Sequence, residues 1–314
     1  MRKENQTIMR QDLLFSNKYI NIIIMLIVCA LWGSLFPIIK IGYSAFHIMA
    51  DDIPTIILFA GLRFVISGII LIGVSWIKAG NFKLPAKIEF SSIFLVGLTS
   101  IILHYGFTYI GLSLGEGSKS AIIKQVGFLF LSCFAFLFEK EDKFKWPKFW
   151  AGILGFAGII VTSMDGVGLS FRAGDMMLIM ASLCSVASNV ISKQVIKRIN
   201  PIQLVAYSQF IGGVCLCIAG LFLGGKIEYM DWKGGLVFAY ICFASITAYS
   251  LWNVLLKYND LSKMSVIKFT EPLFAVIFSG VLLGESIFRV SYLIAFVIIF
   301  VAILLSNVKI NKEK

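Results

Sequence analysis

The feature that most constrains this chain is a series of ten apolar segments, each close to the length of a membrane-spanning helix. Such a helix needs roughly 20 consecutive, mostly apolar residues. The segments are bounded by charged residues, Pro or Gly and lie at residues 20–42, 55–77, 91–112, 118–138, 148–164, 174–193, 202–223, 234–256, 262–283 and 290–308. The sequence therefore predicts an all-α integral membrane protein with ten transmembrane helices.

Composition supports this prediction and argues against a nucleic-acid partner. Hydrophobic residues make up 59% of the chain and charged residues 14%, whereas soluble proteins carry about 25% charged residues. The net charge of +11 would suit nucleic acid. However, the basic residues lie in short loops between apolar segments, not on one face of a soluble module. We therefore expect the lipid bilayer as a partner and no nucleic acid.

The positions of Lys and Arg predict the orientation, because cytoplasmic loops carry an excess of both. With the amino terminus inside, 19 of the 28 basic residues fall in cytoplasmic segments, five in outer loops and four within spans. The five outer residues are Lys119, Arg172, Lys226, Lys233 and Arg289. We predict a multi-pass protein of the cytoplasmic membrane, with a cytoplasmic amino-terminal segment (residues 1–19) and a cytoplasmic tail (residues 309–314).

Two similar phrases indicate an internal repeat. SAIIKQVGFLF (residues 120–130) aligns with MSVIKFTEPLF (residues 264–274) at a shift of 144 residues, which superimposes Lys124 on Lys268. Ten helices divide into two units of five, residues 20–164 and 174–308, and an odd number of helices makes the second unit enter the membrane in the opposite sense. We therefore expect two inverted five-helix repeats with a substrate site near the midplane.

Lys124 and Lys268 are the first candidate site residues. A charge near the bilayer centre costs at least roughly 2.5–3.5 kcal/mol. This cost favours a water-filled cavity in which both ammonium groups bind a carboxylate or a phosphate. The alternative is structural, with each lysine paired to a glutamate or reaching along its helix to the interface. Lys268 has Glu271 one helical turn away, whereas no carboxylate follows Lys124 at that spacing.

Glu271 has two interpretations, and the neighbouring Pro272 is a candidate structural or gating residue. If the substrate anion and Glu271 compete for Lys268, substrate binding and protonation become linked, and a proton is the coupling ion. Otherwise Glu271 forms a permanent bridge to Lys268. Pro272 is expected to free a backbone carbonyl and kink the ninth helix, which would suit a gating element.

Other polar and aromatic side chains inside the spans could also contribute to the site. Arg63 must face protein or water and is either structural or part of a gate. Asn189 and Asn253 could contact substrate or simply link helices. Trp32 and Tyr105 could form cavity walls, with core packing as the alternative.

Three stretches resemble the drug/metabolite transporter superfamily, in its ten-helix branch built from two EamA domains. They are ALWGSLFPIIK (residues 30–40), LRF (residues 62–64) and EPLFAVIFSGVLLGE (residues 271–285). The resemblance covers about residues 20 to 307. It implies a carrier of small metabolites, often an exporter of amino acids or related compounds.

Enzymatic function has little support, because the chain has only two histidines and neither a metal-ligand cluster nor a GxSxG motif. We expect no metal and no cofactor. The sequence predicts a secondary transporter that moves a small polar metabolite, such as an amino acid or a carboxylate. The family resemblance implies that this metabolite is exported. The alternatives are a flippase for a lipid-linked anionic metabolite and a multidrug exporter of the same fold.

Overall fold

The computed structural model describes residues 17–79, 87–127, 172–259, 270–286 and 290–306, together with isolated positions between 129 and 169 and at 264, 267 and 268. Both ends of the chain, residues 131–138 of the predicted 118–138 span and most of the predicted 148–164 span lie outside the described residues.

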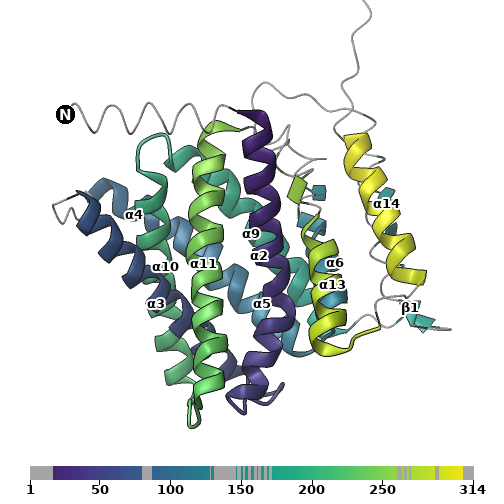
Figure 1. Cartoon of the computed structure of the whole chain (residues 1–314), viewed down its shortest axis with the longest axis horizontal. Coiled ribbons are helices and arrows are strands. Elements are labelled where there is room, and N and C mark those ends of the chain that lie inside the picture. Colours follow the sequence, from purple (N-terminus) through teal and green to yellow (C-terminus); the bar gives the residue numbers. More distant parts are fainter. Residues whose placement is uncertain are drawn as a thin grey trace, which may run out of the picture.

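The described residues form a bundle of helices with one very short β-hairpin (Figure 1). The elements are α2 (Lys18–Ala45), α3 (Ile53–Ala79), α4 (Lys87–Gly97), η1 (Leu98–Leu103), α5 (His104–Ser113), α6 (Gly117–Ile123), β1 (Met164–Asp165), β2 (Gly168–Leu169), α9 (Ala173–Val195), α10 (Pro201–Phe222), α11 (Trp232–Tyr258), α13 (Glu271–Leu283) and α14 (Val290–Ser306).

Among the described residues, six helical segments are long and apolar enough to cross a membrane. They are Tyr19–Ala45, Ile53–Ile77, Glu89–Ser113, Ala173–Val195, Pro201–Phe222 and Trp232–Tyr258. Two shorter apolar segments, Glu271–Leu283 and Val290–Ala302, lie near the end of the chain. The helical, membrane-spanning character is therefore confirmed, whereas the count of ten helices remains a prediction.

Polar side chains fix where several helices begin. The Asn17 side chain accepts hydrogen bonds from the backbone of α2, and Asn200 accepts one from the Ile202 N–H of α10. Asp231 accepts a hydrogen bond from the Gly234 N–H at the start of α11. Each side chain satisfies backbone donors that have no partner inside their own helix.

Three helix–helix contacts build the centre of the bundle. Helix α2 packs against both α11 and α13, and α3 packs along α10 (Figure 1). The approach of α3 to α10 requires a glycine, because a Cβ atom on Gly68 would lie 2.6 Å from the Phe210 backbone nitrogen. Helix α14 lies at the edge of the bundle.

Three spans depart from regular α-helix close to the predicted site residues. The third span contains the π-helical η1 between α4 and α5. Helix α6 ends at Ile123, and Lys124 and Gln125 form a turn. A turn at Thr270 likewise precedes α13. Such interruptions are frequent at functional sites in membrane helices.

The break at Thr270 changes the expectation for Pro272. The sequence suggested a kink inside one helix of residues 262–283, but α13 begins at Glu271 and Pro272 lies in its first turn. A proline is tolerated there because the first helical N–H groups have no intrahelical partner. Pro272 therefore helps to start a new helical segment.

Candidate functional site

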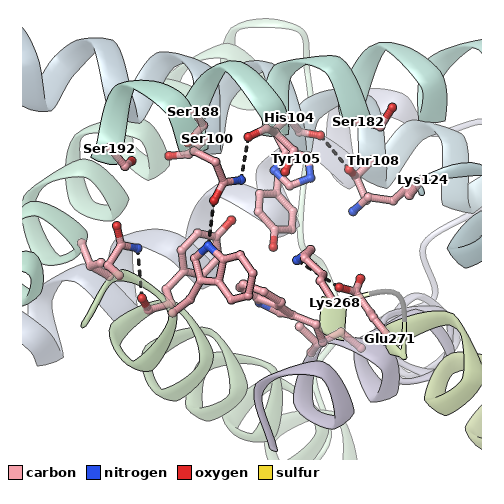
Figure 2. Close-up of a pocket in the computed structure, with 18 of the residues that line it drawn as sticks. Ser100, His104, Tyr105, Thr108, Lys124, Ser182, Ser188, Ser192, Lys268 and Glu271 are labelled. Carbon is pink, nitrogen blue, oxygen red and sulfur yellow. Dashed lines mark hydrogen bonds and ion pairs between the residues drawn. The ribbon is translucent and has the colours of Figure 1, made fainter. Parts of the chain in front are cut away.

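A polar cavity lies among α2, α5, α9 and α11 and is closed on one side by Lys124, Lys268 and Glu271 (Figure 2). Its volume of about 70 Å³ leaves room for several water molecules. Many of the other wall residues carry hydroxyl, amide or imidazole groups: Ser100, His104, Thr108, Gln125, Ser182, Ser185, Ser188, Ser192 and Ser208.

Most site residues predicted from the sequence lie on the wall of this one cavity. They are Trp32, Tyr105, Lys124, Asn189, Asn253, Lys268 and Glu271. Arg63 and Pro272 are buried but do not line the cavity. The structure thus brings side chains from distant parts of the sequence together, while their roles remain predictions.

Lys124 presents its ammonium group to the cavity without a carboxylate partner. Its Nζ atom lies 5.4 Å from the centre of the Phe36 ring and 5.7 Å from that of Tyr105. Within the described part of the chain, Lys124 forms no ion pair. Two aromatic faces attract the cation weakly, so a positive charge is left available to a ligand.

Lys268 has a different environment, because it is paired and enclosed. Its Nζ atom lies 3.0 Å from Glu271 Oε2 and 3.5 Å from the centre of the Trp32 ring. Trp252 provides a second aromatic face at 4.8 Å. Lys268 Nζ and Glu271 Oε2 are close enough to form an ion pair, but their relative orientation does not make a hydrogen bond. The two aligned lysines therefore differ in the charge that they offer to a ligand.

The amide side chains of the cavity wall are partly engaged by the protein. Trp252 Nε1 donates a hydrogen bond of 2.7 Å to Asn189 Oδ1, and Asn189 Nδ2 donates one of 2.8 Å to the Ser185 carbonyl. Asn253 Nδ2 donates to the Tyr249 carbonyl, which leaves Asn253 Oδ1 buried without a partner. Asn189 thus links α9 to α11, and Asn253 keeps an acceptor for a ligand.

A row of serines on α9 was missed from the sequence. Ser182, Ser185, Ser188 and Ser192 all line the cavity. Their spacing of three or four residues places them on one helical face, and this spacing is the signal that could have identified them. The row gives one wall of the cavity a continuous set of hydroxyl groups.

Arg63 lies in the core behind the cavity wall. Its Nη1 atom donates a hydrogen bond of 2.7 Å to the Tyr109 hydroxyl, and its Nε atom donates to Ser245 Oγ. The guanidinium carbon lies 5.1 Å from the centre of the Tyr105 ring, whereas Nη2 has no hydrogen-bond partner. Arg63 therefore connects α3 to α5 and α11, as expected for a structural role.

A network of polar contacts joins helix ends beyond the cavity. Glu285, just after α13, accepts hydrogen bonds from the backbone N–H groups of Gly117 and Ser118 at 2.9 and 3.0 Å. Lys40 Nζ lies 3.7 Å from the same carboxylate. Lys119 forms an ion pair with Asp175 at 3.0 Å. These contacts hold α2, α6, α9 and α13 together at one end of the bundle.

The surroundings of Glu285 stabilise its charged form. Partial burial alone would raise the pKa of the Glu285 carboxyl, but three hydrogen bonds from Gly117 and Ser118 and the nearby charge of Lys40 lower it below its ordinary value. The balance of these effects holds the carboxylate ionised at neutral pH.

Metal binding has no support among the described residues, where no three His, Cys, Asp or Glu side chains lie together in a metal-binding arrangement.

Several proteins resemble the chain over most of its length. YvbV from Bacillus subtilis, an uncharacterised transporter, is 31% identical and the match covers 90% of each chain. YedA from Escherichia coli K12, an uncharacterised inner membrane transporter, is 25% identical, with coverage of 88% of this chain and 87% of YedA. A probable amino-acid metabolite efflux pump from Salmonella typhimurium is 24% identical over 83% of this chain and 86% of its own.

A solved crystal structure shares the fold. It has a TM-score of 0.66 and 14% sequence identity, and the match covers 93% of this chain and 98% of the other. The similarity therefore extends over nearly the whole bundle.

The family profile described as the EamA-like transporter family matches twice, at residues 20–164 and 172–308. These two matches confirm the resemblance inferred from the sequence, and the family and the names of the relatives indicate a membrane transporter of small molecules, not an enzyme. The chain belongs to the EamA-like transporter family, within the drug/metabolite transporter superfamily.

Proposed function

We propose that the protein is a secondary transporter that moves a small polar metabolite with an anionic group by alternating access. Two inverted five-helix repeats would rock about the central cavity. The two consecutive family matches support this arrangement. So do the interruptions next to Lys124 and at Thr270, which occupy similar places in the aligned phrases. In transporters with inverted repeats, broken helices of this kind surround the substrate.

The observation that carries the proposal is the Lys124 ammonium group, which has no ion-pair partner among the described residues and faces a polar cavity with room for several water molecules. A buried charge without a partner is costly, and a substrate carboxylate or phosphate would remove that cost. In this role Lys124 binds the anionic group. Trp32 and Tyr105 form the aromatic walls, and Asn253 accepts a hydrogen bond from the rest of the substrate.

The cavity wall reaches towards both ends of the spans, with Ile39 and Leu112 near the predicted outer ends. Its serine row extends to Ser192, near the end of α9 that the basic residues predict to be cytoplasmic. The network around Glu285 joins the opposite helix ends. We propose that a polar cargo enters along this serine row from the cytoplasm, as export requires.

The test is substrate counterflow in proteoliposomes, with candidate carboxylates and amino acids as cargo. Lys124→Ala is expected to reduce uptake at least about tenfold, because the variant loses a charge-assisted contact. Lys226→Ala, which changes an exposed lysine outside the cavity, is the matched control and should transport normally. Normal uptake by Lys124→Ala would refute the proposal.

A flippase for a lipid-linked anion is the second candidate, because a basic cavity also suits a lipid phosphate. The same assay distinguishes the two. Uptake of water-soluble cargo supports the transporter, whereas movement of a polyprenyl phosphate alone supports the flippase.

A proton as coupling ion predicts that a pH gradient drives uptake.

A further inference from the structure

The charges deep in the predicted spans do not balance. Away from the span ends, these segments contain the three cations Arg63, Lys124 and Lys268 but a single carboxylate, Glu271. Glu271 is already paired with Lys268 at 3.0 Å. Two positive charges therefore remain, and within the described residues neither has a carboxylate partner.

These two charges belong to one region of the protein. The Arg63 guanidinium carbon lies 5.1 Å from the centre of the Tyr105 ring, and Lys124 Nζ lies 5.7 Å from the same centre. Tyr105 is itself part of the cavity wall (Figure 2). Because the protein interior screens charges less than bulk water does, both cations act on whatever occupies the cavity.

We propose that the group recognised in the cavity carries two negative charges, as in a dicarboxylate or a phosphate monoester. This inference rests on the proposed function and specifies its substrate class. A dianion balances the charge of Arg63 and Lys124, whereas a monoanion leaves one buried charge without compensation. Lys124 contacts the dianion directly. Arg63 acts on it through the electric field, from behind the Tyr105 ring.

A zwitterion fits this arrangement less well. The ammonium group of an amino acid would need a carboxylate, and Glu271 is held by Lys268 inside the cage of Trp32 and Trp252. The buried acceptor of Gln125, which has no partner, suits a neutral donor such as a hydroxyl group. A cargo with two acidic groups and a hydroxyl group therefore pairs with more of the charged and polar side chains of the cavity wall.

The experiment compares matched ligands that differ by one negative charge. The purified full-length protein is titrated at constant ionic strength with succinate or its monoamide, and with glycerol 3-phosphate or its methyl ester, and thermal stability reports binding. To test whether the ligand is instead a lipid phosphate, the thermal stability of the protein is compared in nanodiscs with and without polyprenyl phosphate. We expect the dianionic member of at least one pair to bind about tenfold more tightly.

Two variants test the origin of the preference. Lys124→Gln should abolish the difference within a pair. Arg63→Lys, which retains the charge, should preserve that difference even if it lowers the melting temperature.

Equal binding of both members of every pair, or tighter binding of the monoanionic member, would overturn the dianion proposal. If that binding still required Lys124, the proposed transport function would stand. If no anion bound in any arm, both proposals would fail together.

Discussion

At the scale of single residues, the two lysines show how one sequence pattern leads to two environments. Lys124 and Lys268 align in the repeat, but only Lys268 is paired with a carboxylate and enclosed by two tryptophans. A repeat preserves the backbone position of a residue, whereas the side chains around it differ because the two halves differ in sequence. Lys268 is therefore expected to serve structure more than Lys124 does.

The Lys268–Glu271 pair yields a prediction about stability. Lys268→Met or Glu271→Gln alone should destabilise the protein by about 3–5 kcal/mol. Lys268→Met removes the cation that faces the buried Glu271 carboxylate. Glu271→Gln removes the anion that faces the buried Lys268 ammonium group. The double variant should recover most of this loss, since it buries no charge at this pair. Thermal unfolding in detergent measures all three.

Transport by the double variant then separates the two interpretations of Glu271. A stable double variant that transports normally would identify a structural bridge. A stable double variant that no longer responds to a pH gradient would identify Glu271 as the coupling residue.

The hydrogen bond between Trp252 and Asn189 yields a second prediction. Trp252→Phe keeps an aromatic ring but removes the Nε1 donor, so Asn189 Oδ1 loses its 2.7 Å partner. We expect a loss of about 1–3 kcal/mol, the usual cost of an unsatisfied buried acceptor. Trp232→Phe, at a residue 71% exposed, is the control and should change the melting temperature little. Equal effects of the two substitutions would contradict the role assigned to this bond.

A site residue could be predicted from the sequence when its polarity differed strongly from that of the surrounding segment. Lys124 and Glu271 are charges in apolar segments, so the sequence alone identified them. The serines of α9 were missed because a serine is ordinary in a membrane helix and only its shared face is informative. The spacing of Lys268 and Glu271 predicted their pairing. The enclosure of Lys268 by Trp32 and Trp252 could not be derived, because these two rings come from distant helices.

At the scale of helices, the contact between Glu285 and α6 is the main link across one end of the bundle. The carboxylate accepts the first N–H groups of α6, where the helix dipole also favours a negative charge. Because this contact joins the segment after α13 to α6, it connects a helix of the first family match to one of the second.

This contact predicts a pH dependence of stability. The pKa of Glu285 is lowered in the folded protein from its ordinary value of 4.5, so its contribution is fully present above about pH 4.5 and is lost as the pH falls further. Glu285→Gln should therefore lower the melting temperature at pH 7, and the difference from wild type should shrink towards pH 3. Glu228→Gln, at an exposed position, is the control.

A difference between wild type and Glu285→Gln that stayed constant from pH 7 to pH 3 would contradict this account of the contact.

The helices themselves were easier to predict than their interruptions. Long apolar segments such as 55–77 and 202–223 correspond closely to α3 and α10 because burial in lipid dictates both length and composition. The π-helical η1 and the turn at Lys124 left no such signal. They change a few backbone hydrogen bonds without changing the apolar pattern, so hydropathy cannot detect them.

In the whole molecule, a duplicated family domain, a polar cavity and an excess of buried positive charge occur together. The family matches cover both halves, and the cavity lies where side chains from both halves meet, with Tyr105 and Lys124 from one and Asn253 and Lys268 from the other. A cavity bounded by both repeats becomes accessible to either side of the membrane if the repeats rock, which is the requirement for transport.

The most direct measurement of the central claim is chemical restoration of the Lys124 ammonium group. Lys124→Cys is reconstituted in proteoliposomes and treated with bromoethylamine, which converts the cysteine to a lysine analogue, and Lys124→Ala treated identically controls for the other cysteines. The account predicts that Lys124→Cys binds and transports the anionic cargo poorly, and that treatment restores transport in this variant alone. Transport at the wild-type rate by untreated Lys124→Cys would contradict it.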